Sequence, residues 1–110
     1  MELETAVISL SALGEPTRLG IFRRLVEAGP DGLFVGQIAE RLTLSPGALS
    51  FHLKTLSQAG LVQSRKEGTF VRYAARFDTM NGLVAYLTET CCGGHPERCA
   101  PGVGSSIHPS

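Results

Sequence analysis

The sequence has no uninterrupted apolar stretch near the roughly 20 residues that a membrane-spanning helix needs. Its N-terminus also lacks the charged region, apolar run and cleavage site of a secretory signal. The chain has 110 residues, of which 43% are hydrophobic and 18% are charged, a composition typical of one globular domain. We therefore expect a single folded unit in the cytoplasm, without a membrane partner.

The chain also lacks an excess of charge of either sign, which by itself argues against a nucleic-acid-binding protein. Its 10 basic and 10 acidic residues are, however, unevenly distributed. Residues 1–40 carry three basic and six acidic residues, residues 41–76 carry six and one, and residues 77–110 carry one and three. Contact with phosphates requires a local basic patch, and residues 41–76 provide one.

Cysteine is scarce, and the count of three is odd. A disulfide framework is not expected in a reducing compartment, and a tetrahedral zinc site of four cysteines is excluded. The sequence contains no Cys-x-x-Cys motif, no βαβ pattern and no constellation of carboxylates and histidines for catalysis. A thiol oxidoreductase is therefore disfavoured, and we expect a protein that is not an enzyme.

Residues 45–76 are the most informative part of the chain. Ser45 is a good helix N-cap, and Pro46 suits the first helical position. Leucines 49, 53 and 56 form one apolar stripe at helical spacing, and Gly60 is placed to end the helix. The opposite face is small, hydroxylated and cationic, which suits close approach to a polyanion.

Beyond this helix the pattern changes from helical to alternating. Residues 62–67 and 70–75 form two alternating runs around Glu67-Gly68, which predicts a β-hairpin with a basic tip. A helix with a polar outer face followed by such a hairpin is the layout of a winged helix-turn-helix. The helix would lie in the major groove, and the wing would contact the flanking backbone.

Apolar spacing predicts further helices over residues 3–13, 16–28, 34–42 and 77–90. In the second and third of the chain's helices the residues expected to point inward are Leu19, Ile21, Phe22, Leu25, Val26, Val35, Ile38, Ala39 and Leu42. Those expected to point outward from the second helix are Arg18, Arg23, Arg24 and Glu27. The last helix carries more apolar surface than its own domain needs, and the first is amphipathic as well. Both features indicate a partner protomer. We expect residues 1–90 to form the DNA-binding and dimerisation domain, and residues 91–110 to form a flexible Gly/Pro/Ser-rich tail.

Several separated motifs resemble the ArsR/SmtB family of metal-responsive repressors. In chain order they are GEPTRL at 14–19, IAERL at 38–42, SPGALSFHLK at 45–54 and AGLV at 59–62. The resemblance covers roughly residues 5–90. It implies a mainly α-helical, homodimeric winged helix-turn-helix with a small β-hairpin, which represses transcription by binding double-stranded operator DNA until an inducer binds.

The candidate DNA-binding residues combine the outward helix positions, the wing and one position suggested by the family pattern. Residues in the helix would approach the bases, whereas cations in the wing would touch phosphates without reading sequence. His52 lies near the leucine stripe, so it could equally pack, but the family pattern Ser-x-His-Leu favours contact. The set is Ser45, Gly47, Ser50, His52, Lys54, Arg65, Lys66 and Arg72.

The family resemblance also directs attention to the end of the last helix. A Cys-Val-Cys site in the third helix is absent here, and Asp78 has no histidine partner within the last helix for a zinc site. Cys91, Cys92 and Cys99 instead resemble a subgroup of arsenic repressors with three thiols at and beyond the end of this helix. The glycines at 93 and 94 would give the chain the freedom to bring three sulfurs to one As(III) or Sb(III) ion.

Other uses of these thiols stay open. His95 could complete a Cys₃His site for zinc or cadmium, and lead is another thiophilic ion that such a site could sense. Reversible oxidation of the neighbouring thiols would instead make the protein a redox-responsive repressor of the same fold. A constitutive DNA-binding module with an incidental tail is a further alternative.

Overall fold

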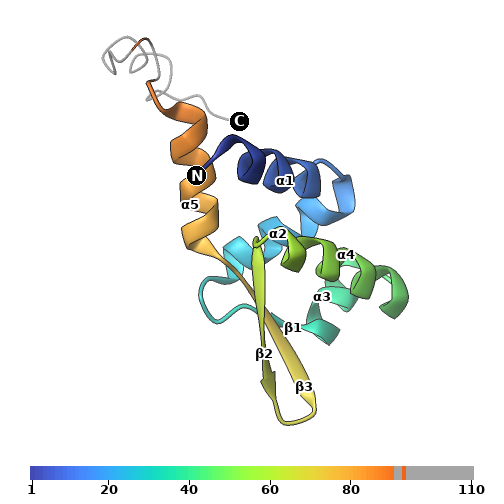
Figure 1. Cartoon of the computed structure of the whole chain (residues 1–110). Helices are drawn as coiled ribbons and strands as arrows, with labels where there is room; N and C mark the ends of the chain where they lie inside the picture. The colour runs from blue at the N-terminus through green and yellow to red at the C-terminus, as the bar shows by residue number, and fades with distance from the viewer. Residues whose placement is uncertain (91–92, 94–110) are drawn as a thin grey trace, which may run out of the picture.

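The computed structural model describes residues 1–90 and residue 93. Its elements in chain order are α1 (Leu3–Leu13), α2 (Pro16–Ala28), β1 (Leu33–Phe34), α3 (Val35–Leu42), α4 (Pro46–Gln58), β2 (Val62–Glu67), β3 (Phe70–Ala75) and α5 (Phe77–Thr88). Figure 1 shows the β2–β3 hairpin projecting from one end of a helical body, with α1 and α5 at the other end. The predicted mainly helical winged helix-turn-helix fold is confirmed.

No helix in the described part of the chain combines the length and the apolar character that crossing a membrane would require.

The core forms where the apolar stripes of α2, α3 and α4 meet. Leu49, Leu53 and Leu56 of α4 are all buried, as their spacing predicted. Ile21 and Leu25 of α2 are fully buried against the same cluster, which Ile38 of α3 and residues of the sheet complete. Because α4 is fixed along its whole leucine stripe, its opposite face is held rigidly toward solvent.

Local signals define both ends of α4. The Ser45 hydroxyl oxygen accepts a hydrogen bond from the Ala48 N–H at 3.2 Å, which satisfies one of the free donors of the first turn. Gly60 follows the helix with a φ of 75°, a conformation that glycine adopts without steric cost. The predicted cap and stop are therefore confirmed.

The β-sheet has one strand more than the sequence predicted. β2 and β3 pair antiparallel across the two-residue turn Gly68-Thr69, and β1 adds to the outer edge of β3. At the junction before β1 the backbones approach so closely that a Cβ on Gly32 would lie 1.9 Å from the Tyr73 carbonyl oxygen. Only glycine fits there.

Three expectations about the helices were wrong in detail. The third helix begins at Val35 and not at Phe34, because Leu33 and Phe34 pair with Tyr73 and Arg72 of β3. The last helix ends at Thr88 and not at Thr90. Some predicted inward residues are less buried than expected: Leu19 is 42% exposed, and Val26, Val35, Ala39 and Leu42 are half-buried.

Candidate nucleic-acid interface

The exposed face of α4 carries the predicted contact residues of this helix. Gly47, Ser50 and Lys54 lie opposite the buried leucines and are exposed, and Ser45 is exposed at the N-terminal end. Ser50 also lines a groove of about 260 Å³ that separates α4 from α3 and from Val71 and Tyr73 of the wing. The helix face and the wing are therefore neighbours, and together they can approach one ligand.

His52 takes a different position from the other candidates on α4. Its side chain is only 15% exposed, and its Nδ1 lies 3.3 Å from a terminal nitrogen of Arg18 and 4.0 Å from Glu15 Oε1. Arg18 Nε donates a second bond to the Ala12 carbonyl oxygen at 2.7 Å. The expectation that Arg18 points outward was wrong, because it joins the end of α1 to the middle of α4.

This arrangement gives His52 a packing role in the described structure. The Glu15 carboxylate accepts from the Arg18 backbone N–H at 2.9 Å, which fixes the first turn of α2. The first turn of α2 therefore contacts His52 through Glu15 and Arg18. The buried leucines hold α4 itself against the core. A direct contact of His52 with DNA stays a prediction.

In the wing, Arg65 and Arg72 are directly opposite each other on β2 and β3. Two like charges in this relation repel, but Glu67 lies on the same face two residues from Arg65. Its Oε2 accepts from Arg65 Nε at 2.9 Å and from Arg72 Nε at 3.0 Å, and its Oε1 accepts from Arg72 at 3.2 Å. One carboxylate therefore holds both guanidinium groups.

The pKa of Glu67 is lowered, first by the hydrogen bond from Arg72 and then by that from Arg65. The pKa of Arg72 is raised, with the hydrogen bond to Glu67 as the main cause. Both groups stay charged at neutral pH, so the local charge of this triad is one positive and not two. Lys66 is exposed on the other face of β2 and has no ion pair within the described residues.

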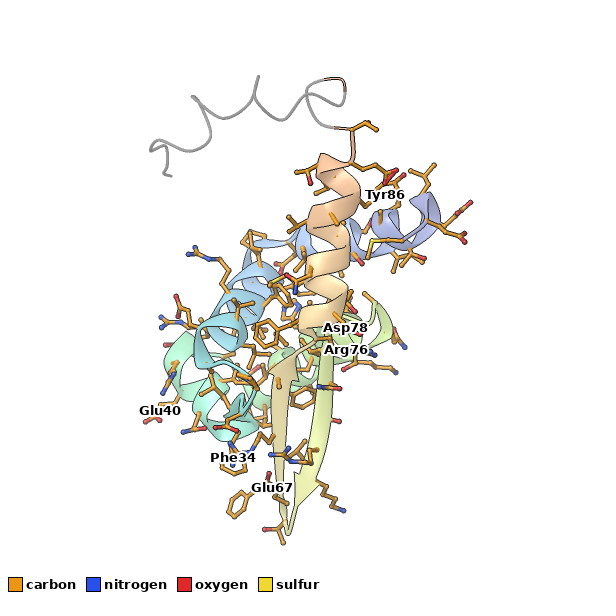
Figure 2. The ribbon with its side chains drawn as sticks, turned by 90° about the vertical axis from the view of Figure 1, so that its left-hand side faces the viewer. Phe34, Glu40, Glu67, Arg76, Asp78 and Tyr86 are labelled. Atoms are coloured by element: carbon orange, nitrogen blue, oxygen red, sulfur yellow. The ribbon has the colours of Figure 1, made fainter. Side chains whose placement is uncertain are left out.

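Arg72 is the structural anchor of the wing. Its guanidinium lies 4.0 Å above the Phe34 ring, and a terminal nitrogen donates to the Asp31 carbonyl oxygen at 3.2 Å. The Phe34 ring in turn meets the Phe70 ring edge-on at 5.9 Å, and Figure 2 shows Phe34 beside the distal half of the hairpin that carries Glu67. With a side chain only 23% exposed, Arg72 has less freedom to reach a phosphate than Arg65, which is 64% exposed.

Phe51 is an exposed residue of α4 that was not among the predicted DNA-contact residues. It is 63% exposed and lies between Leu49 and Leu53 in the sequence, so it points away from both. The signal was present, because a position two residues from each of two buried leucines must face outward in a helix. A polar outer face was expected, and the large apolar ring stood outside that pattern.

A short joint connects the wing to the last helix. The Arg76 N–H donates to the Leu61 carbonyl oxygen at 2.8 Å, and its guanidinium bonds Asp78 Oδ2 at 2.9 Å. The hydrogen bond from the Arg76 guanidinium is the main cause that lowers the pKa of Asp78, and a bond from the Thr79 N–H is the next. Figure 2 shows Arg76 and Asp78 together where β3 passes into α5.

Two helix faces at the end opposite the wing are apolar and exposed. Val7 and Leu10 of α1 are 51% and 43% exposed, and Val84 and Leu87 of α5 are 55% and 57% exposed. Figure 1 shows α1 beside α5 at this end. Exposed apolar helix faces of this kind are typical of an interface.

The three predicted sulfur ligands, Cys91, Cys92 and Cys99, lie outside the described residues. The described residues just before them show that α5 ends at Thr88 and that Thr90 has a φ of 55°. The helix therefore ends before Cys91. Within residues 1–90 and 93, no group of three or more His, Cys, Asp and Glu side chains could hold a metal ion.

Comparison with known proteins places this architecture in a family. Residues 13–65 match the family model described as a helix-turn-helix domain. The chain is 32% identical to the arsenical resistance operon repressor of Bacillus subtilis, over 74% of this chain and 73% of that protein. It is also 36% identical to the transcriptional activator HlyU of Vibrio cholerae, over 79% and 78%. The chain belongs to the ArsR family of winged-helix transcriptional regulators.

Solved structures of related proteins share the fold. HlyU superposes with a TM-score of 0.65 at 35% identity, covering 84% of this chain and 99% of that one. The homodimeric winged helix-turn-helix DNA-binding domain of Mb0332 from Mycobacterium bovis gives a TM-score of 0.65 at 26% identity, covering 84% and 86%. These relatives are regulators and not enzymes, which confirms the expectation that this chain is not an enzyme.

Proposed function

We propose that the chain is a homodimeric repressor that binds operator DNA and is released when As(III) or Sb(III) binds Cys91, Cys92 and Cys99. The observation that carries the proposal is the exposed face of α4, with Gly47, Ser50 and Lys54, beside a basic wing in a chain of the ArsR family. A helix of this kind enters the major groove, and the wing contacts phosphates. Lys66 and Arg65 are the wing residues best placed for that contact.

The dimer follows from the exposed apolar faces of α1 and α5. A second copy would bury Leu10, Val84 and Leu87 and related residues, which lie at the end of the molecule opposite the wing. In a two-fold dimer the two copies of α4 would then reach half-sites about one helical turn apart, ~34 Å. The homodimeric state of Mb0332 supports this assembly.

The inducer site rests on the chemistry of its donors. Soft thiolates select soft, thiophilic ions, and three sulfurs match the three-coordinate preference of As(III). Two adjacent cysteines can reach one ion only outside a regular helix, and α5 ends before them. The arsenical resistance operon repressor of Bacillus subtilis supports a metalloid as the inducer class.

The coupling would run through α5. The thiols directly follow this helix in the chain, α5 packs against α1, and β3 enters α5 through Arg76. A change at the end of α5 can therefore alter both the dimer contact and the aim of the wing. The coupling is reciprocal, so DNA also weakens inducer binding, and about 1–3 kcal/mol is typical of such linkage.

The proposal is tested by following operator binding while As(III) is added. Cys91→Ser and Cys92→Ser are expected to bind the operator like the wild type but to stay bound at As(III) concentrations that release it. Arg23→Met, on the exposed side of α2, controls for a general effect of substitution and is expected to bind and to be released like the wild type. Release of the Cys variants at the wild-type concentration would contradict the assigned site.

The same assay distinguishes two alternative functions, a sensor of thiol oxidation and a sensor of another thiophilic ion. A reduced form of HlyU has been solved, which favours including peroxide among the inducers as a test of thiol oxidation. Cadmium, zinc and lead test the other thiophilic ions and a ligand role for His95. Because HlyU is named an activator, a reporter gene behind the operator decides the sign: we expect loss of the chain to raise expression.

A further inference from the structure

We propose that Phe51 is a specificity-determining residue that reads the C5-methyl group of a pyrimidine base in the major groove. The inference rests on the proposed operator binding and goes beyond it, because it names a residue and the chemical group that it recognises. Phe51 is 63% exposed at the middle of the α4 surface that faces away from the core. Most of this ring is therefore open to solvent in the part of the chain that the structure describes.

The position of the ring follows from helix geometry. Phe51 is two residues from Leu49 and two from Leu53, about 200° around the helix from each, and both leucines are buried. Its neighbours on the exposed face are Gly47, four residues before it, and Lys54, three residues after it. The ring therefore lies in the centre of the surface that would enter the groove.

Gly47 leaves room for this ring to meet a base. Side chains in a helix lean toward the N-terminus, so the Phe51 side chain is directed toward the turn that contains Gly47. Nothing lies within 4 Å of where a Cβ on Gly47 would be, so the space over that turn is open. A base edge can approach the ring from this side without displacing another side chain.

The ring is also supported from the protein side. It meets the His52 ring edge-on, with centroids 5.5 Å apart and planes at 65°. His52 is held by Arg18, which bonds the Ala12 carbonyl oxygen at the end of α1. A chain of contacts therefore joins the dimer helix α1 to the exposed ring, so Arg18 and His52 act as positioning residues for it.

The ligand chemistry follows from the ring having no hydrogen-bonding atom. In the major groove the only apolar feature of an unmodified base is the C5-methyl of thymine, and phenylalanine is one of the side chains that contact it. 5-Methylcytosine carries the same group at the same place. A phosphate or a polar base edge would gain nothing from Phe51, whereas Lys54 beside it can serve a phosphate.

The test uses the full chain and a duplex that it selects from a random library. Each thymine of the selected site is replaced in turn by deoxyuridine, which removes the methyl group and keeps every hydrogen-bonding atom. Burial of one methyl group corresponds to about a fourfold change in affinity. Replacing one thymine in one half-site is therefore expected to lower the affinity about fourfold, and replacing the equivalent thymine in both half-sites about 16-fold. Phe51→Ala is expected to bind thymine and uracil duplexes equally.

Matched variants separate base reading from general effects. Phe70→Ala removes a ring that is 66% exposed, but on the wing, and is expected to keep the full difference between thymine and uracil. Phe51→Leu keeps an apolar side chain and is expected to keep part of the difference between thymine and uracil. This variant replaces Phe51→Ala as the test if Phe51→Ala does not fold. At the sensitive position, 5-methylcytosine paired with guanine is expected to bind about fourfold more tightly than cytosine paired with guanine.

The proposal is overturned if no thymine of the site is sensitive to loss of its methyl, or if Phe51→Ala keeps the wild-type difference. Equal binding of cytosine and 5-methylcytosine would overturn it as well. Tight binding to the selected duplex with no methyl effect would leave operator binding intact and remove only the role of Phe51. Failure to bind any duplex at low salt would instead remove the proposed function.

Discussion

At the scale of single residues, the charges of the wing are governed by one acidic side chain. Glu67 accepts hydrogen bonds from Arg65 and Arg72, which would otherwise repel across the strands. Arg72 also lies over the Phe34 ring, so its main role is to stabilise the wing and not to reach DNA. The exposed Lys66 is the wing cation with most freedom to reach DNA.

Removing the charge of Lys66 or of Glu67 should change DNA binding in opposite directions, which tests the roles assigned to these two residues. Lys66→Gln is expected to weaken DNA binding and to reduce the slope of log affinity against log salt by about 1, as for one lost phosphate contact. Glu67→Gln is expected to tighten non-specific binding and steepen that slope, because Arg65 and Arg72 are no longer neutralised. Equal losses of affinity in both variants would contradict this account.

The lowered pKa of Glu67 also predicts a pH dependence of stability. A carboxyl whose pKa is lower in the folded protein than in the unfolded chain stabilises the fold above the unfolded pKa. That contribution is lost as the pH falls through the lowered folded value, below the ordinary glutamate pKa of about 4.3. The melting temperature of the wild type should therefore exceed that of Glu67→Gln at pH 7, and the difference should shrink as the pH falls below the ordinary glutamate pKa.

Arg18 provides a second prediction at this scale. Arg18→Met removes the bond to the Ala12 carbonyl oxygen and the contact with His52, and bonds to charged groups are worth about 1.5–3 kcal/mol. We expect a lower free energy of unfolding and weaker operator binding, although Arg18 lies outside the exposed face of α4. Arg23→Met on the exposed side of α2 is the matched control and should change neither in chemical denaturation and binding assays.

At the scale of elements, α4 owes its position to signals that the sequence displays. The cap at Ser45, the leucine stripe and the stop at Gly60 are local, so its bounds were predicted almost to the residue. β1 was missed because two residues cannot show an alternating pattern, and their strand conformation comes from pairing with β3 about 40 residues later. The partners of Arg18 and Glu67 were missed for the same reason: tertiary contacts decide them.

Two glycines at the ends of α4 should respond in opposite ways to alanine. Gly60→Ala is expected to destabilise the fold by roughly 1–2 kcal/mol, because Gly60 has a φ of 75°. Gly47→Ala, with open space around its Cβ, is expected to stabilise it by about 0.5–1 kcal/mol. Gly47→Ala should nevertheless weaken operator binding, and thermal unfolding measured beside DNA affinity distinguishes the two effects. A fall in both for Gly47→Ala would indicate that the helix itself is disturbed.

At the scale of the whole molecule, function is divided between two ends. The wing and α4 form the proposed DNA-reading end, whereas α1 and the C-terminal end of α5 lie at the other (Figure 1). An inducer bound at one end can act on the other only through the helices between them. The apolar surface of α1 and α5 was predicted from the sequence, whereas the packing of the two helices against each other needed the fold.

The dimer is tested by placing a charge in its proposed interface. Val84→Glu is expected to convert the dimer to a monomer in analytical ultracentrifugation, because a carboxylate cannot be buried there without a partner. Affinity for the full operator should fall strongly, since two linked half-sites no longer act together. Phe70→Glu, at a ring more exposed than Val84 but on the wing, should leave the mass unchanged. A dimeric Val84→Glu would place the interface elsewhere.

The most direct measurement is a titration of the operator-bound dimer with As(III), in which fluorescence anisotropy of labelled DNA and thiolate–arsenic absorbance are recorded together. The account predicts that absorbance rises and anisotropy falls in parallel, with both complete at one As(III) per protomer. Saturation of the absorbance while the DNA stays bound would contradict it.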